Sequence, residues 1–309
     1  MSEPSPYAAA IARVPVREDE VELRGGRTRF WVYGADDAPH RVVLLHGLRG
    51  DHHGLEPIVA HLTGARVVVP DLPGFGQSSP LPGYAHDVAG YAAWTRDLLA
   101  AVAPAGDVVL AGHSFGSIVA AAALGRPAPS AAGSVPPPRV RGLVLVNPIA
   151  ASALAGPRVV VTRLTVLYHR LAAALPERAG TALLRHRLMT RVASTAMATT
   201  RDPGLRRWIH AEHDRYFSTF ADRATLLQAF HASVGHDVGE FAAGIAVPTL
   251  LVAAERDDIA PPAAQRALAG RFPDARLAMV PGTGHLAHYE APAAVATAMS
   301  AFLTALPVP

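Results

Sequence analysis

The feature that most constrains the fold is a regular alternation between short apolar runs rich in β-branched residues and longer segments with helical periodicity. The six runs are predominantly apolar rather than alternately polar, which is typical of parallel strands buried on both faces. They occupy residues 41–45, 66–69, 107–110, 140–146, 249–252 and 275–280, and helical patterns appear at 55–62, 87–102, 115–124, 262–272 and 291–306. This alternation predicts an α/β protein built from right-handed βαβ units, opened by a hairpin over residues 20–33.

One interval departs from this alternation of strand-like runs and helical segments. Residues 148–244 contain no strand-like run, but they carry apolar residues at helical spacing, for example Leu164, Leu167 and Leu171. We interpret this interval as a helical cap, or lid, inserted after the fourth of the parallel strands. The predicted domains are therefore an α/β core made of residues 1–147 and 245–309 and a cap made of residues 148–244.

The composition is that of an ordinary globular enzyme, with 50% hydrophobic and 17% charged residues. The absence of cysteine excludes disulfides, thiolate metal ligands and a cysteine nucleophile. The first residues, MSEPSPY, lack the basic region and apolar run of a secretory signal, so we expect a cytoplasmic protein. Residues 108–125 and 291–309 are uncharged over nearly the length of a bilayer span, but one contains a glycine-rich turn and the other ends in prolines. We expect no integral membrane segment.

The formal charge of +3 conceals an asymmetry along the chain. Residues 148–231 contain 12 Arg and 5 acids, a net charge of +7, whereas the remaining residues contain 16 Arg and 20 acids, a net charge of −4. A solvated helix face explains such a section more simply than an anion-binding surface does. No nucleic-acid partner is expected, and the sequence leaves the oligomeric state open.

The segment GHSFG at residues 112–116 fits the G-x-S-x-G pattern of a nucleophile elbow. It follows one of the predicted strands and begins a predicted helix, as the elbow requires. Glycines at its two ends allow the tight turn that exposes the hydroxyl of Ser114, and the helix dipole favours negative charge beside it. This context predicts a nucleophilic Ser114 rather than the serine of an ordinary glycine turn.

With this elbow the chain resembles the α/β-hydrolase superfamily over residues 20–302. Further landmarks follow in the family's order, namely His46-Gly47, DLPGFGQS at residues 71–78 and PGTGHLAHYEAP at residues 281–292. The resemblance implies a mostly parallel, doubly wound sheet, a cap, and a triad in the chain order serine, acid, histidine. A serine at the elbow argues against relatives that use an aspartate nucleophile on carbon–halogen or epoxide bonds.

The base and the acid of the triad come from the last third of the chain. A serine hydroxyl needs a base, and the resemblance implies His285, which is the first histidine of its motif; His288 is the alternative. The imidazole in turn needs a carboxylate. In the family pattern the acid lies three residues after a small residue, here Ala254, which implies Asp257. The neighbouring acids Asp258 and Glu255 are the second and third choices.

An oxyanion requires two preorganised N–H donors, one from the residue after the nucleophile and one from the loop after an early strand. These positions are Phe115 and Leu48. The segment at residues 71–78 lacks the Gly-Lys-Ser/Thr of a phosphate-binding loop, and the histidine pairs lack an H-E-x-x-H pattern or a cysteine partner. We expect no metal site and no cofactor.

Together these residues predict a serine hydrolase that cleaves a carboxylic ester, or a related acyl bond, of a small to medium apolar substrate through an acyl-enzyme. Thioesterases, carbon–carbon bond hydrolases and cofactor-free perhydrolases share the same triad, so they remain alternatives. A weakly catalytic ligand-binding protein of the same fold is a further alternative. The substrate-binding residues are not predicted.

Overall fold

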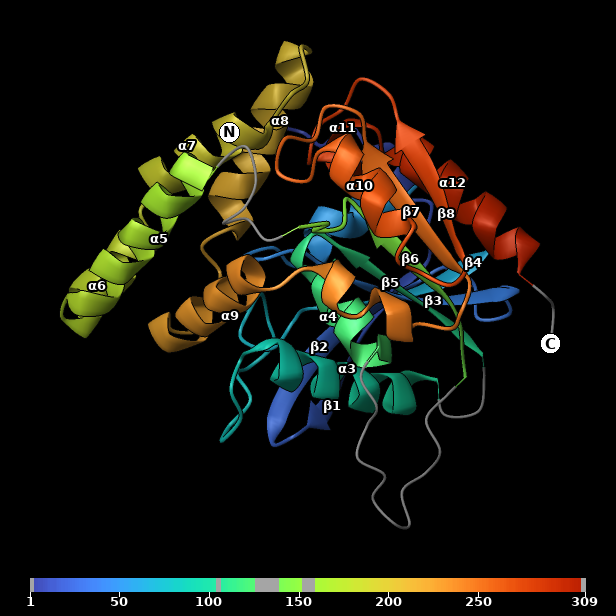
Figure 1. The fold of residues 1–309 in the computed structure, drawn as a ribbon, viewed down its shortest axis with the longest axis horizontal. Coiled ribbons are helices and arrows are strands. Elements are labelled where there is room, and N and C mark those ends of the chain that lie inside the picture. The colour runs from blue at the N-terminus through green and yellow to red at the C-terminus, as the bar shows by residue number, and fades with distance from the viewer. Residues whose placement is uncertain (1–2, 104–106, 126–138, 152–158, 307–309) are drawn as a thin grey trace.

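Eight strands form a single sheet in the computed structural model, which describes residues 3–103, 107–125, 139–151 and 159–306 (Figure 1). The strands are β1 (Val16–Leu23), β2 (Gly26–Tyr33), β3 (His40–Leu45), β4 (Ala65–Pro70), β5 (Val108–His113), β6 (Val140–Val146), β7 (Thr249–Ala254) and β8 (Ala275–Val280). Their order is β1-β2-β4-β3-β5-β6-β7-β8. The pairings of β1 with β2 and of β2 with β4 are antiparallel, and all others are parallel. The predicted mostly parallel α/β sheet is confirmed.

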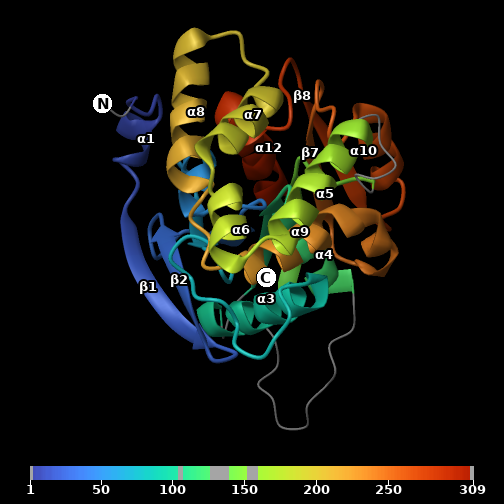
Figure 2. The same cartoon turned by 90° about the vertical axis from the view of Figure 1, so that its left-hand side faces the viewer.

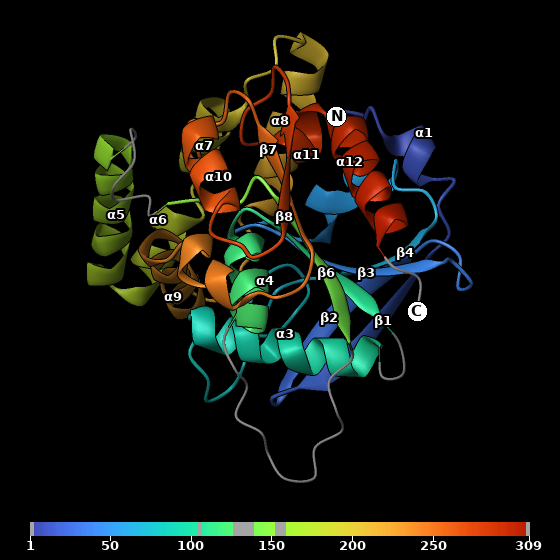
Figure 3. The ribbon, with the colours of Figure 1, turned by 45° about the vertical axis from the view of Figure 1, so that its right-hand side comes forward.

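Helices cover both faces of the sheet. They are α1 (Ala8–Ile11), α2 (Glu56–Val59), α3 (Val88–Val102), α4 (Phe115–Gly125), α5 (Val159–Ala174), α6 (Glu177–Leu184), α7 (Arg187–Met197), α8 (Pro203–Tyr216), α9 (Arg223–Gly235), α10 (Pro262–Ala269), α11 (Ala287–Glu290) and α12 (Pro292–Ala305). Figure 3 shows α12 on one side of the sheet and α3 and α4 on the other.

Alternate residues of each central strand enter two separate cores, because successive side chains of a strand point to opposite faces. In β3, Val43 and Leu45 join the core beneath α3 and α4, whereas Val42 and Leu44 join the core beneath α2 and α12. All four side chains are at most 1% exposed. Burial on both faces explains why these strands appear in the sequence as continuous apolar runs.

Two of the predicted helices are shorter in the structure than expected, and the cause is the same in both. The segment predicted at 55–62 is a 3-10 turn over His52–Leu55 followed by the single turn of α2, and the segment predicted at 262–272 ends with α10 at Ala269. In both cases the residues after the helix bond to carbonyls three residues back, so the last turn tightens into 3-10 geometry. The opening hairpin begins at Val16 rather than at residue 20.

The described part of the connection from β6 to β7 contains the α-helices α5 to α9, followed by two 3-10 turns at Val238–Glu240 and Ala242–Gly244. Figure 2 shows α5, α6 and α7 as the outermost layer on the face turned toward the viewer. Residues 152–158 of the predicted cap lie outside the described residues. In the described part of the chain, no helix combines the length and apolarity that crossing a bilayer requires.

Candidate active site

The turn between β5 and α4 places Ser114 at the carboxyl edge of the sheet. Ser114 has a φ of 53°, a left-handed conformation that costs energy for any residue except glycine. The glycines on either side are sterically required. A Cβ at Gly112 would overlap the carbonyl oxygen of Gly116, and a Cβ at Gly116 would overlap the carbonyl oxygen of Leu45. The strand–turn–helix expected from the elbow pattern is therefore present.

Parallel strands bring the other candidate residues to the same edge. β6 ends directly before Asn147, β7 ends three residues before Asp257, and β8 ends five residues before His285. Because these strands and β5 run in one direction, the segments that follow them converge near Ser114. Residues more than 170 positions apart along the chain thus meet at one site.

Ser114, His285 and Asp257 form a continuous chain of hydrogen bonds. The distance from Ser114 Oγ to His285 Nε2 is 2.8 Å, and that from His285 Nδ1 to Asp257 Oδ2 is 2.7 Å. An ionised carboxylate only accepts hydrogen bonds, so Nδ1 carries the ring proton and donates to Asp257. Nε2 is then free to accept the proton of the Ser114 hydroxyl. This tautomer is the one that a general base needs.

Asp257 is 2% exposed and accepts hydrogen bonds at both carboxylate oxygens. The N–H groups of Ile259 and Ala260 donate to Oδ1, while His285 and the side-chain amide of Asn147 donate to Oδ2. Burial alone would raise the pKa of this carboxyl, but the His285 ring and the hydrogen bonds outweigh burial and hold the pKa below its usual value. Asp257 is therefore ionised at neutral pH.

The alternative candidates for the base and the acid are not part of this chain of hydrogen bonds. His288 is buried, its Nδ1 has no partner among the described residues, and burial lowers its pKa well below the ordinary value. Its ring packs on that of His113, 4.0 Å between centroids, rather than on Ser114. Asp258 is exposed, and Glu255 accepts a hydrogen bond from the Gly282 N–H. The structure brings His285 and Asp257 to Ser114 and leaves these three residues apart.

The two expected oxyanion donors lie beside the nucleophile. Phe115 is the first residue of α4, and Leu48 follows Gly47, where a Cβ would come within 3.2 Å of the Ser114 Cβ. Over the described part of the chain, neither the Phe115 nor the Leu48 N–H has a hydrogen-bond acceptor in the protein. Both amides are thus available to a negatively charged oxygen at Ser114.

Comparison with known proteins identifies the family to which this arrangement belongs. The family model described as the alpha/beta hydrolase fold matches residues 40–292. The chain belongs to the α/β-hydrolase family. No curated protein sequence matches this hydrolase.

Solved structures resemble this hydrolase at low sequence identity. An esterase from Thermogutta terrifontis has a TM-score of 0.70 and 22% identity, covering 93% of this chain and 98% of that one. A putative lipase from Acinetobacter baumannii AYE has a TM-score of 0.72 and 18% identity, covering 96% and 93%. An enol-lactonase from Burkholderia xenovorans LB400 has a TM-score of 0.68 and 23% identity, covering 93% and 100%. At such identities the likeness extends to the fold alone.

Asn147 is a site residue of this hydrolase that the sequence did not reveal. Its φ is 44°, its N–H donates to the Val252 carbonyl, and its Nδ2 donates to Asp257 Oδ2 at 3.0 Å. Asparagine tolerates this left-handed backbone better than most residues do. The sequence feature that could have revealed Asn147 is its position, because it is a polar residue directly after a strand that neighbours β5.

We expect Asn147→Ala to lower kcat of this hydrolase about tenfold with little change in KM, because Asp257 loses a donor that orients it toward His285. Steady-state kinetics on a soluble ester measure this effect. Asn147→Asp, which keeps the size but places a second carboxylate beside Asp257, should shift the acidic limb of the kcat/KM profile to higher pH. If both variants behave like the wild type, Asn147 is only a packing residue.

Two further residues tie the helices between β6 and β7 to the loops of the site. Arg49, next to Leu48, donates from Nε to the Phe217 carbonyl at 2.9 Å and from Nη2 to the Leu184 carbonyl at 2.8 Å. Glu290, five residues after His285, accepts hydrogen bonds from Thr199 and from the Thr200 and Gly284 N–H groups. These contacts fix the helical segment against both loops of the hydrolase.

A cluster of metal-ligand residue types occurs at one place in the described chain, where ring nitrogens and a carboxylate oxygen of Asp51, His52 and His53 lie within 4.8 Å of one another. The side chains already have partners. His52 Nδ1 lies 2.9 Å from Asp71 Oδ1, and His53 Nδ1 lies 3.2 Å from Asp51 Oδ1. Hydrogen bonding and packing account for this cluster, and the expectation of no dedicated metal site stays a prediction.

Glu212 on α8 is an acid with a strongly shifted pKa, because burial raises the pKa of its carboxyl to about 7. The unfolded chain ionises this carboxyl near its ordinary pKa, so between about pH 4.5 and 7 the folded state binds more protons than the unfolded state. The free energy of unfolding should therefore fall as pH rises through this window.

Glu212→Gln should remove this pH dependence, because the amide stays neutral. The full shift corresponds to about 3 kcal/mol, and partial solvation of the side chain reduces the expected effect to about 1–2 kcal/mol. Urea denaturation should show equal stabilities at pH 4.5 and a more stable variant at pH 8. Equal stabilities at both pH values would show that Glu212 is an ordinary solvated acid.

Proposed function

We propose that this chain hydrolyses carboxylic esters, with Ser114 as nucleophile, His285 as general base and acid, and Asp257 as the carboxylate that orients the base. The observation that carries the proposal is the pair of hydrogen bonds at 2.8 Å and 2.7 Å that join the three side chains. Ser114 is half-buried, so a substrate carbonyl can reach its hydroxyl.

In the proposed mechanism, Ser114 Oγ attacks the ester carbonyl while its proton passes to His285 Nε2. The carbonyl oxygen becomes an oxyanion and accepts hydrogen bonds from the N–H groups of Leu48 and Phe115. Collapse of this intermediate expels the alcohol, which takes the proton from His285 and leaves an acyl group on Ser114. Water then attacks the acyl-enzyme, with His285 again removing a proton, and releases the acid.

Residues 148–244 are proposed as the cap of the site. Support comes from the hydrogen bonds of Arg49 and Glu290 to this segment and from the backbone bonds that join its residues 219–221 to residues 74–76. Both sets of contacts lie on loops at the carboxyl edge of the sheet. A helical layer held there excludes water from the reaction and shapes the substrate pocket.

The similar solved structures favour ester hydrolysis over the other reactions of this triad. They are an esterase, a putative lipase and an enol-lactonase. Thioester hydrolysis, carbon–carbon bond hydrolysis and perhydrolysis remain alternatives on the same residues.

A panel of substrates tests the proposal. Short and long p-nitrophenyl esters, lactones, thioesters and vinylogous diketones are each assayed with the wild type and with Ser114→Ala as the blank. We expect the highest kcat/KM on an oxygen ester. A higher value on a thioester or a diketone would assign the chain to that reaction instead. Tight binding of these substrates without turnover would assign it to the ligand-binding class.

A further inference from the structure

The outer layer of helices carries a concentration of exposed apolar side chains. Eight large hydrophobic residues among those described are strongly exposed; five of them lie on α5 and α7, and a sixth directly follows α5. They are Leu164 (61% exposed), Leu167 (53%) and Leu171 (54%) on α5, Leu175 (41%) directly after α5, and Leu188 (62%) and Val192 (55%) on α7. A patch of this kind on a soluble domain marks a surface that contacts something else.

Leu164, Leu167 and Leu171 of α5, together with Leu175 directly after it, form one ridge that the internal packing of the protein does not use. Their spacing of three, four and four residues places them on a single stripe of the helix. The opposite side of α5 faces the protein, where Ala172 is fully buried and the His169 ring stacks on Phe230 at 3.6 Å. The ridge is therefore free for another occupant. Figures 1 and 2 place α5 and α7 in the same outer layer.

Arginines adjoin the ridge, and the acid that follows it in the chain, Glu177 of α6, is paired with Arg223. Helices α5 and α7 contain four arginines and no aspartate or glutamate. Arg191 pairs with Asp214 of α8, but Arg163, Arg170 and Arg187 have no ion pair with any residue that the structure describes. A second copy of the same face would bring arginines against arginines, so charge argues against self-association through this surface.

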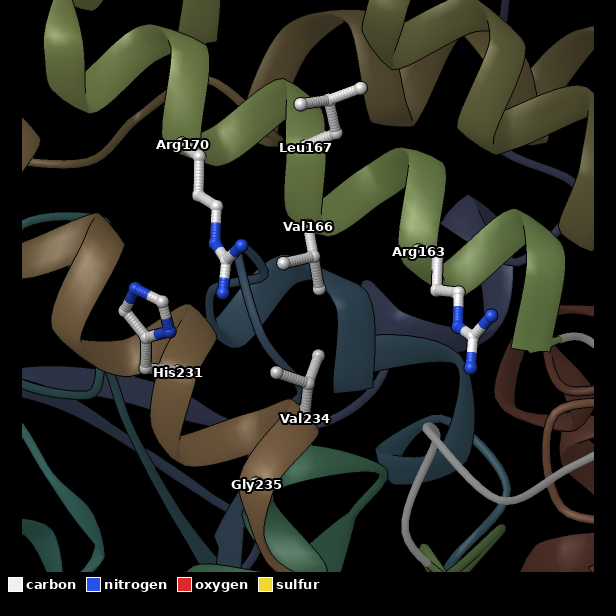
Figure 4. A pocket seen from close by; sticks show the side chains of 7 residues that line it. All are labelled: Arg163, Val166, Leu167, Arg170, His231, Val234 and Gly235. Carbon is white, nitrogen blue, oxygen red and sulfur yellow. The ribbon is translucent and has the colours of Figure 1, made fainter.

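A groove of about 400 Å³ lies beside the ridge, between α5 and α9. Figure 4 shows Arg163 and Arg170 extending from α5 toward this groove, with His231 of α9 across from them. Val166 and Val234 give the groove an apolar wall. None of the proposed catalytic residues lines it. An anionic headgroup with an attached hydrocarbon chain matches this combination of cationic and apolar groups.

We propose that the outer face of α5 and α7 docks on anionic lipid bilayers, with the leucine ridge entering the headgroup region and the arginines pairing with lipid phosphates. Helices that lie in a membrane interface have the same features: an apolar stripe is flanked by cationic side chains that reach toward the lipid phosphates. Docking in this way leaves the chain at the surface of the bilayer and brings lipid-dissolved molecules to the protein. The inference concerns binding and stands independently of the reaction proposed for Ser114.

The test is sedimentation of the purified full chain with vesicles of phosphatidylcholine alone or with about one third phosphatidylglycerol. We expect binding to the anionic vesicles only, lost at about 0.5 M salt because salt screens the arginines. Arg163→Gln/Arg170→Gln should weaken binding about thirtyfold, and Leu167→Gln/Leu171→Gln should weaken it by about tenfold or more. The matched controls Arg266→Gln/Arg276→Gln and Val16→Gln, exposed residues on other elements, should bind like the wild type.

Folding and self-association are measured on the same samples. Thermal melting by circular dichroism and turnover of a soluble ester should be the same for all variants, so that a loss of binding is not a loss of structure. Absence of wild-type binding, equal binding to both vesicle types, or equal loss in the control variants would overturn the proposal. A wild-type dimer that Leu167→Gln/Leu171→Gln converts into a monomer, without vesicle binding, would assign the ridge to a second copy.

Discussion

Ser114→Ala is expected to lower kcat on a p-nitrophenyl ester by about 10⁵-fold, or about 7 kcal/mol of transition-state stabilisation, with little change in KM. The variant lacks the only atom that bonds to the substrate carbonyl in the proposed mechanism. The Leu48 and Phe115 N–H groups remain, so a small residual rate over water should persist. Stopped-flow and steady-state measurements of p-nitrophenol release check both expectations.

Ser117→Ala is the matched control for this change. Ser117 lies one helical turn after Ser114, and its hydroxyl donates to the Ser114 carbonyl at 2.5 Å and accepts from the Ile149 N–H. Its removal should cost about 1 kcal/mol of stability and less than about tenfold in kcat. Comparable losses in the two variants would show that the turn, and not the Ser114 hydroxyl, limits the reaction.

Asp257→Asn is expected to lower kcat by about 10⁴-fold, which is the second large effect. An amide nitrogen facing His285 would donate where the carboxylate accepts, so the ring would carry its proton on Nε2 and could not accept the proton of Ser114. The substitution preserves the shape of the side chain, and the melting temperature should therefore fall much less than the activity does.

Asp258→Asn separates the two acids that the sequence left in competition. Asp258 is exposed and adjacent in the chain, so its amide variant should keep the wild-type kcat. Equal losses in Asp257→Asn and Asp258→Asn would indicate that the charge of the loop, and not a single hydrogen bond, supports His285. A loss confined to Asp258→Asn would contradict the assignment of the acid.

The sheet could be predicted well from the sequence because its strands are buried on both faces. Burial requires nearly every residue of a strand such as β6 to be apolar, and the run predicted at 140–146 coincides with that strand. The short helical segments do not need to be apolar at nearly every residue. Whether residues 60–62 continue α2 or tighten into a 3-10 turn depends on local hydrogen bonds that periodicity does not encode.

The residues of the candidate site also divide into those that the sequence could predict and those that it could not. Ser114 could be predicted because glycines are sterically required on both sides of it, which leaves a pattern within five residues. Asn147, Arg49 and Glu290 act through contacts with distant segments, and no short pattern surrounds them. The exposed leucines of α5 show most clearly what the sequence alone could not predict. Their spacing predicted the helix, but only the structure shows that the ridge faces outward.

The most direct test of the central claim is covalent labelling of the wild-type chain with a fluorophosphonate, followed by intact-mass and peptide mass spectrometry. The reagent phosphonylates a serine whose hydroxyl is activated by a neighbouring base, so it reports on the proposed nucleophile without assuming a substrate. We predict one adduct per chain, located on the peptide that contains Ser114 and absent from His285→Ala. No adduct, or an adduct on a different serine, would contradict the account.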